Sequence, residues 1–246
     1  MTFDAASVVL SDPSPVSTEQ LAEAALAAYT VAGDVSAAVL PVLDAVSLLG
    51  EPSFNSWADV IATEDGFPLL GTGRRASTYA ALMWNGARLD AAQPSPRWAP
   101  LLAALAAAGA DTGLDRVGHS VLAGLGVADE AAVLLAADPL AYPTLGTLAA
   151  AVAASLVGPS EGADLADVLD LAASLAAFAP DGRSAGSGWL AGHAAASGWL
   201  AARVPADVIT PMPGSVVHTL SAVAGRPVAA RDSVPSKVDE LLRMLR

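Results

Sequence analysis

The chain has 246 residues, a net charge of −13 at pH 7 and no cysteine. This length allows one large domain with a substantial core. The acidic balance argues against a nucleic-acid partner, because the summed field repels a polyanion and no basic cluster exceeds Arg74-Arg75. The lack of cysteine excludes disulfides and thiolate metal sites, and the three scattered histidines lack metal-ligand spacing. We therefore expect a protein without a metal or other cofactor.

The apolar content is high, with 54% hydrophobic residues but only 5% aromatic ones. Many short apolar side chains favour closely packed helices. Asp4 stands where a signal peptide would carry positive charge, so we expect a cytoplasmic protein. The uncharged stretch 139–160 approaches the roughly 20 residues that span a bilayer. Its proline, glycine and alanines favour a buried core helix over a membrane segment.

Residues 1–16 contain two prolines and no sustained period, so they are predicted to form an extended arm. Ser17 is an N-cap candidate, with Gln20 completing a capping box, for a first helix that ends near Gly33. A second helix is predicted at 35–49, with a kink at Pro41. Apolar residues at three- and four-residue spacing then predict helices at 56–63, 76–89, 98–108, 114–123, 128–135, 144–156, 163–177 and 188–201.

Alternating strand patterns are almost absent, so the fold is predicted to be mainly α, with one helical domain over 17–246. The Pro- and Gly-rich segment 205–235 is expected to cross the surface of the bundle. Extended structure at 208–210 or 228–230 would be too brief to define a sheet. A last helix is predicted at 236–246, with charges that complement its dipole.

Small and turn-forming residues recur inside these helices. They are Trp84-Asn85-Gly86, Gln93-Pro94-Ser95, Tyr142-Pro143-Thr144-Leu145-Gly146 and the run from Gly192 to Gly198. Together they resemble the MmgE/PrpD family, which includes methylcitrate dehydratases, cis-aconitate decarboxylases and iminodisuccinate epimerases. The resemblance runs from about Ser56 to about Val204. It implies a single multi-helix bundle like the family's helical domain, without the α+β lid domain that its enzymes normally carry.

The sequence departs from the family's pattern where chemistry is expected. Only Asp90 is left of the acidic motif, and Gln93, which cannot shuttle protons, stands in place of a histidine. Tyr142 replaces the histidine of a His-Pro-Thr turn, and a phenol is a poor base at neutral pH. Ser187 stands where a lysine would hold a substrate carboxylate, although Arg183 could restore a cation from a shifted position.

The resemblance and these departures define the candidate residues. The candidate catalytic residues are Asp90, Tyr142 and His193, and the candidate substrate-binding residues are Arg88, Gln93, Thr144, Ser187, Trp84 and Trp189. Structural interpretations compete with these roles. Gly188, Gly192 and Ala196 recur every four residues, which favours close helix packing over ligand contact. For His193, a structural or exposed side chain is favoured over a catalytic role. For Asp90, a helix cap or a solvated carboxylate is favoured over a role in the site.

Two further features have open interpretations. The stretch 71–75, Gly-Thr-Gly-Arg-Arg, could cradle an anion, but it lacks the spacing of a P-loop, so a flexible entry to the next helix is favoured. The five tryptophans are expected to anchor the core, or else to wall an apolar cavity that alanines leave unfilled.

Three functions are compatible with this sequence. The first is binding of a small, relatively apolar molecule in a helical pocket, with a metal-free elimination, isomerisation or cyclisation of lyase or isomerase type. The second is a non-catalytic partner or binding subunit, in a homodimer or a heteromeric complex. The third is dehydration or decarboxylation of a small polycarboxylate, which would need cations that the matching positions lack.

Overall fold

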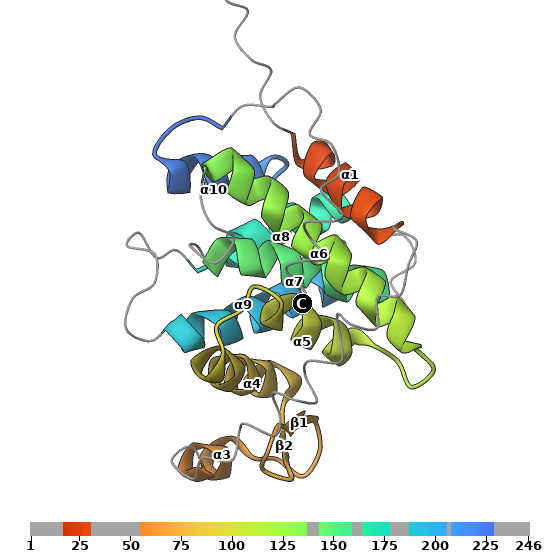
Figure 1. Ribbon diagram of the computed structural model, residues 1–246, viewed down its shortest axis with the longest axis vertical. Helices are drawn as coiled ribbons and strands as arrows, with labels where there is room; N and C mark the ends of the chain where they lie inside the picture. Colours follow the sequence, from red (N-terminus) through yellow and green to blue (C-terminus); the bar gives the residue numbers. More distant parts are fainter. Residues whose placement is uncertain are drawn as a thin grey trace, which may run out of the picture.

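The computed structural model describes residues 17–30, 55–136, 143–158, 164–177, 187–205 and 208–228. Within these ranges the chain is mainly helical, as predicted. The helices are α1 (Thr18–Tyr29), α3 (Asn55–Ile61), α4 (Thr78–Ala92), α5 (Trp98–Ala107), α6 (Leu114–Leu135), α7 (Pro143–Val157), α8 (Leu165–Leu175), α9 (Ser187–Arg203) and α10 (Ser215–Ala224), and the strands are β1 (Phe67–Leu69) and β2 (Arg74–Ala76). Figure 1 shows α3 and the strands at one end of the molecule, beyond α4, with α1 and α10 toward the other.

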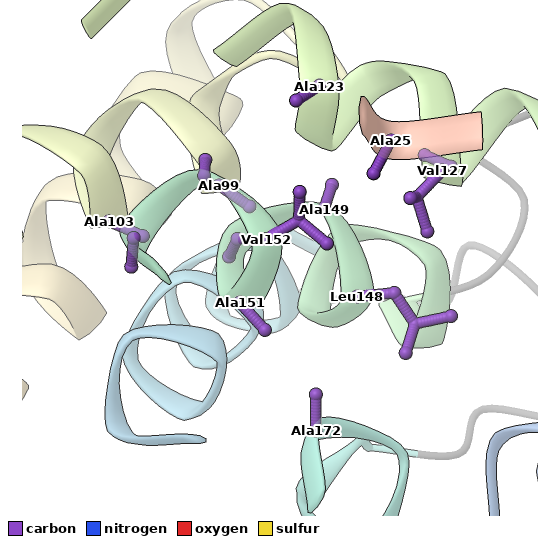
Figure 2. Close-up of a cluster of buried hydrophobic side chains, with 14 of the residues drawn as sticks. Ala25, Ala99, Ala103, Ala123, Val127, Leu148, Ala149, Ala151, Val152 and Ala172 are labelled. Carbon is purple, nitrogen blue, oxygen red and sulfur yellow. The ribbon is translucent and has the colours of Figure 1, made fainter. Parts of the chain in front are cut away.

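Helix α7 forms the centre of the bundle. It packs against α5, α6, α8 and α9, and every side chain from Leu148 to Ala153 is fully buried. In Figure 2, Ala149 and Val152 lie among alanines contributed by α1, α5, α6 and α8. Short side chains on every facing helix bring the helix axes close together, as the composition predicts.

Helices α4 and α9 touch through their backbones. A Cβ on Gly86 would lie 2.5 Å from the Cα of Gly192, and one on Gly188 would lie 2.7 Å from the carbonyl oxygen of Ala87. A Cβ on Gly192 would overlap the carbonyl oxygen of Met83. Residue numbers rise along α4 as they fall along α9, so the two helices are antiparallel. The predicted packing role of Gly188 and Gly192 is confirmed.

Helix α9 makes a second close contact, with α7. A Cβ on Gly198 would lie 2.5 Å from the Cβ of Ala150, and one on Gly146 would lie 3.2 Å from the Cβ of Ala194. Here the residue numbers rise together, so α7 and α9 run parallel. Glycines at both crossings hold α9 between α4 and α7.

Most predicted helices are present, with shifted ends. The capping box is confirmed, since Gln20 N donates to Ser17 Oγ and Ser17 N donates to Gln20 Oε1, but α1 ends at Tyr29. The two helices predicted at 114–123 and 128–135 are the single helix α6. The helix continues through Gly124. A Cβ at this position would overlap the carbonyl oxygen of Ala149, so this glycine allows α6 to pack closely against α7. Residues 124–127, which the prediction left between two helices, are part of α6.

The stretch 71–75 is the turn and second strand of a hairpin, and the prediction of a flexible helix entry is wrong. Strands β1 and β2 are antiparallel, with Phe67 opposite Ala76 and Leu69 opposite Arg74. Gly71 and Gly73 have φ values of +75° and +71°, a region that glycine adopts without strain. Strands of three residues are too short to produce an alternating pattern.

Segment 205–235 also differs from its prediction, because it contains helix α10. This helix buries Val216 and Leu220, one turn apart, against the bundle, and glycines in the left-handed region flank it on both sides. Residues 208–210 are not a strand. The predicted arm 1–16 and the helices at 35–49 and 236–246 lie outside the described residues.

A buried carboxylate joins three distant parts of the chain. Asp170 on α8 is 3% exposed, and its Oδ1 accepts hydrogen bonds from the Thr18 hydroxyl at 3.1 Å and from Val216 N at 2.9 Å. Its Oδ2 accepts a hydrogen bond from Gly214 N at 2.7 Å. The carboxylate therefore satisfies two backbone donors at the start of α10 and complements its dipole. It holds α1 and α10 against α8.

The apolar stretch at 139–160 contains α7, whose 15 residues are fewer than the roughly 20 that span a bilayer. Among the described helices, only α6 is long and apolar enough to cross a membrane by length and composition. In the bundle, 78% of that apolar window is buried. The core helix of a soluble protein gives the same result, so α6 is weak evidence for a membrane protein.

Replacing Gly192 by alanine tests the contact between α4 and α9. The new methyl group would overlap backbone on α4, so the Gly192→Ala protein should lose about 3 kcal/mol of unfolding free energy in urea. The matched control is Gly109→Ala, where the nearest atom to an added Cβ is Thr112 Oγ1 at 3.8 Å. The control should change stability by less than about 0.5 kcal/mol. Equal losses in the two variants would contradict the close crossing.

The Asp170→Asn substitution tests the buried carboxylate. An amide keeps the shape but has one acceptor oxygen, so a backbone donor at the start of α10 loses its partner. We expect the free energy of unfolding to fall by about 2 kcal/mol, with faster amide hydrogen exchange in α10. The control Asp167→Asn changes an exposed carboxylate on the same helix and should have little effect. Unchanged exchange in α10 would show that the carboxylate does not hold this helix.

Candidate functional site

The segments that carry the sequence motifs meet at one end of the bundle. Because α4 and α9 are antiparallel, the last turn of α4 lies beside the first turn of α9. Because α7 and α9 are parallel, with Gly146 beside Ala194, α7 begins about one turn into α9 and level with the middle of α4. Helix α5 also begins there, since Ala99 lies 3.6 Å from the position of a Cβ on Gly146. We call this the convergent end: the end of α4 and the beginnings of α5, α7 and α9.

Asp90 and Gln93 lie at the convergent end, in the last turn of α4 and at its C-cap. Asp90 is 8% exposed, so its carboxyl group is not a solvated surface charge. The Gln93 side chain is exposed, and its backbone adopts an extended conformation that ends the helix. The Gln93 carbonyl accepts a 2.6 Å hydrogen bond from Trp98 Nε1, which fixes where α5 begins.

Arg97 is a buried cation at this end that sequence analysis did not select. It is 8% exposed, its Nε donates to Ser95 Oγ at 3.1 Å, and its guanidinium lies 5.1 Å from the centre of the Trp98 ring. Burial lowers the pKa of Arg97 below its ordinary value. The sequence signal was an arginine between a turn and a buried tryptophan, where planar stacking can hold a guanidinium.

The first turn of α7 contributes Thr144. This side chain is 1% exposed, and its hydroxyl donates to the carbonyl oxygen of Ala177, just after α8, at 3.2 Å. Thr144 therefore ties α7 to the end of α8. Tyr142, Arg183 and the side chain of Ser187 lie outside the described residues.

Trp84 and Arg88 lie on the side of α4 that faces the hairpin. Trp84 is 1% exposed, and the Arg88 guanidinium, 5.6 Å from its ring centre, donates to the carbonyl oxygen of Leu70 at 3.1 Å. Between them, Asn85 Oδ1 accepts from Leu70 N and Asn85 Nδ2 donates to the carbonyl oxygen of Pro68, each at 2.9 Å. Asn85 and Arg88 are therefore hydrogen-bond partners for strand β1 and for Leu70 directly after it, and burial lowers the pKa of Arg88.

The two arginines of the hairpin are also engaged within the protein. Arg74 forms an ion pair with Asp59 of α3, and Arg75 Nη1 donates to the carbonyl oxygen of Gly66 at 2.7 Å. Both guanidinium groups therefore fasten the hairpin to its surroundings. This geometry gives no support to the anion cradle that the Gly-Thr-Gly-Arg-Arg stretch could have formed.

His193 and Trp189 lie on the side of α9 that faces away from α4 and α7. They are four residues apart and so share one face of the helix. Ser197, one turn further on, is 3% exposed, and its Oγ lies 2.7 Å from His193 Nδ1. Burial lowers the pKa of His193 below its ordinary value. His193 therefore belongs to a different surface from Asp90.

The convergent end combines opposite buried charges with aligned helix ends. The beginnings of α5, α7 and α9 present the positive ends of three helix dipoles, and Arg97 adds a cation. Asp90 is the buried carboxyl group among them. Such a set can hold an anionic group and place a proton carrier near it. Among the described residues, no three His, Asp or Glu side chains form a metal-ligand cluster.

Comparison with protein families, curated proteins and solved structures finds no match to this chain.

The lowered pKa of His193 gives stability a pH dependence. Burial favours the neutral ring, so the unfolded chain binds this proton more tightly than the folded chain. The folded protein therefore keeps its full stability above the unfolded pKa of about 6.5, and loses stability as the pH falls from that value through the lower pKa of the folded state.

Urea unfolding between pH 5 and pH 8 should therefore show a smaller decline toward acid in His193→Gln than in the original protein. An NMR titration of the imidazole should give a midpoint below about 6.5. A midpoint above about 6.5 would contradict the lowered pKa of His193.

Proposed function

We propose that the chain is a divergent MmgE/PrpD-like protein that binds a small, relatively apolar molecule at the convergent end and catalyses a metal-free elimination, isomerisation or cyclisation. The observation that carries the proposal is that α9, which holds one of the three motifs, begins beside the last turn of α4 and packs against both α4 and α7, which hold the other two. Segments far apart in the sequence come together there with a buried cation and a buried carboxyl group.

The charges at this end favour a ligand with one carboxylate and an apolar body. The family's own substrates carry two or three carboxylates, and the lysine that the resemblance would supply is replaced by Ser187. Arg97 is a buried cation that can hold one carboxylate, reinforced by the neighbouring helix dipoles. The surrounding alanines and leucines suit an apolar remainder better than further charges.

In this proposal Asp90 moves the proton. For an isomerisation, the Asp90 carboxylate takes a proton from the carbon that joins the bound carboxylate to the double bond. It returns the proton at the far carbon of that bond, so no atom is gained or lost. Arg97 offsets the negative charge that develops on the bound carboxylate. Burial of both groups at 8% exposure keeps water from weakening the electrostatic interactions.

The longest apolar helix of the described chain is buried in its own bundle, which supports placing the protein in the cytoplasm as part of this proposal.

Cyclohex-2-ene-1-carboxylate is a suitable probe, compared with its alcohol cyclohex-2-ene-1-methanol and with citrate. Saturation-transfer NMR should show saturable binding of the carboxylate, weaker binding of the alcohol, and none of citrate. The Arg97→Gln substitution should weaken carboxylate binding at least about tenfold, the loss expected for a buried charged hydrogen bond. The control Arg203→Gln removes an exposed arginine at the end of α9 and should leave binding unchanged.

Turnover is measured in the same samples by proton NMR in D2O. Deuterium entering the ring, or movement of its double bond, should occur with the original protein and be lost in Asp90→Asn. Circular dichroism confirms that each variant is folded. Failure of all three probes to bind, or equal binding by the Arg97→Gln variant, would contradict the proposal.

A non-catalytic binding or partner subunit is the second candidate function. It is favoured by the use of several candidate residues for packing: Thr144 bonds to the carbonyl oxygen of Ala177, and Arg88 bonds to that of Leu70. Binding of the carboxylate without turnover would support this candidate. Citrate binding with loss of water or carbon dioxide would instead favour the third function, a lyase acting on a polycarboxylate.

A further inference from the structure

Two tryptophans are exposed in a chain that buries most of its large apolar side chains. Trp84 and Trp98 are 1% and 0% exposed, and Trp199 packs against the core. In contrast, Trp57 on α3 is 56% exposed and Trp189 on α9 is 40% exposed. Their surfaces lie together, although the two residues are more than 130 positions apart in the sequence. Neither indole serves as a core anchor, which was the role expected of these tryptophans.

The two indole rings form an angled pair. Their centroids are 5.8 Å apart and their planes are inclined at 58°. An inclination of this size leaves more of the π faces uncovered than a parallel stack would, and both residues are exposed to solvent. A positive charge at the open side can lie within about 6 Å of both ring centres, the range in which cation–π attraction operates.

The charged groups around α3 and the hairpin do not repel a cation, because their three arginines, Arg74, Arg75 and Arg88, are balanced by three carboxylates and bonded within the protein. Asp59, Glu64 and Asp65 belong to α3 and the turn that follows it, and the two arginines of the hairpin are bonded to Asp59 and to the carbonyl oxygen of Gly66. Along the described part of α9, the first residue after Trp189 with a permanent positive charge is Arg203.

His193 does not oppose a bound cation. It shares the face of α9 that carries Trp189, and burial lowers its pKa, so its ring is neutral at pH 7. The whole chain carries a net charge of −13, which raises the local concentration of cations.

We propose that Trp57 and Trp189 form a binding site for an organic cation of the quaternary or methylated ammonium class. Such a cation is weakly hydrated and has apolar methyl groups, so it gains both cation–π attraction and burial of apolar surface on two indoles. A neutral molecule of the same shape gains only the burial of apolar surface. This site is separate from the convergent end and does not depend on the function proposed for it.

Choline and its neutral carbon analogue, 3,3-dimethylbutan-1-ol, have nearly the same shape and differ in charge. Comparing them therefore separates cation–π attraction from burial of apolar surface. Titrated into the full chain, choline should cause a saturable change in tryptophan fluorescence and broaden its own N-methyl proton signal. The neutral analogue should bind at least about fivefold more weakly, as expected for an exposed cation–π contact.

Variants assign the binding to the tryptophan pair. Trp57→Ala and Trp189→Ala should each abolish choline binding, and Trp57→Phe should retain it at reduced affinity, since phenylalanine presents a weaker π face. The matched control is Tyr79→Ala, which removes an aromatic side chain of 40% exposure from α4 and should leave binding unchanged. Circular dichroism verifies the fold of each variant.

Three results would overturn the proposal. Equal affinity for choline and the neutral analogue would make the pair a general apolar surface. Choline binding that persists in both tryptophan variants would place the site elsewhere. No choline binding, with a dimer seen by analytical ultracentrifugation that Trp57→Ala dissociates, would show that a second copy of the chain covers the pair.

Discussion

The glycines at the two crossings of α9 set the arrangement of the rest of the bundle. Gly86, Gly188 and Gly192 let α9 lie directly on the backbone of α4, and Gly198 does the same on α7, while Gly146 of α7 makes room for the Cβ of Ala194. At such distances even one methyl group collides with backbone, which cannot move aside as a flexible side chain can. The relative positions of α4, α7 and α9 are therefore fixed by backbone contact. These contacts place the beginning of α9 beside the end of α4 and the beginning of α7 about one turn further along α9.

This constraint also explains why the two faces of α9 differ. The faces toward α4 and α7 carry glycine and alanine, while the outward face carries Trp189 and His193. At the crossings themselves only glycine and alanine fit, whereas Trp199, seven residues beyond Gly192, packs against the core. The proposed small-molecule site and the proposed cation site thus lie on separate surfaces, one at the end of the bundle and the other beside α3. Asp90 and His193, both candidate catalytic residues, belong to different surfaces for this reason.

The features of the fold that depend on local residue spacing were predictable from the sequence. The capping box at Ser17, the mainly helical fold and the packing role of the α9 glycines follow from spacing, and the structure confirms each. The hairpin was not predictable in this way, because strand β1 draws its hydrogen-bond partners from Asn85 and Arg88 on a later helix. Helix α10 was missed because Asp170, about 45 residues earlier, satisfies its first backbone donors.

The candidate site was predictable only in part. Local motifs indicated which turns could meet, and α4, α7 and α9 do present them at one end. The burial of Arg97 depends on tertiary packing and leaves no periodic signal, and the resemblance to the MmgE/PrpD family drew attention to the lost lysine rather than to a cation elsewhere.

The antiparallel contact of α4 and α9 is the claim on which this account rests, and spin-label distances test it most directly. The chain has no cysteine, so labels attach only at introduced positions. The first pair of spin labels is attached to cysteines introduced at Tyr79 of α4 and Leu200 of α9. The second pair is attached at Ala91 of α4 and Leu200, and all three positions are exposed.

The account predicts that electron–electron double resonance gives the second distance as roughly 10 Å longer, because twelve residues of helix rise about 18 Å. Equal distances, or a shorter second distance, would contradict it.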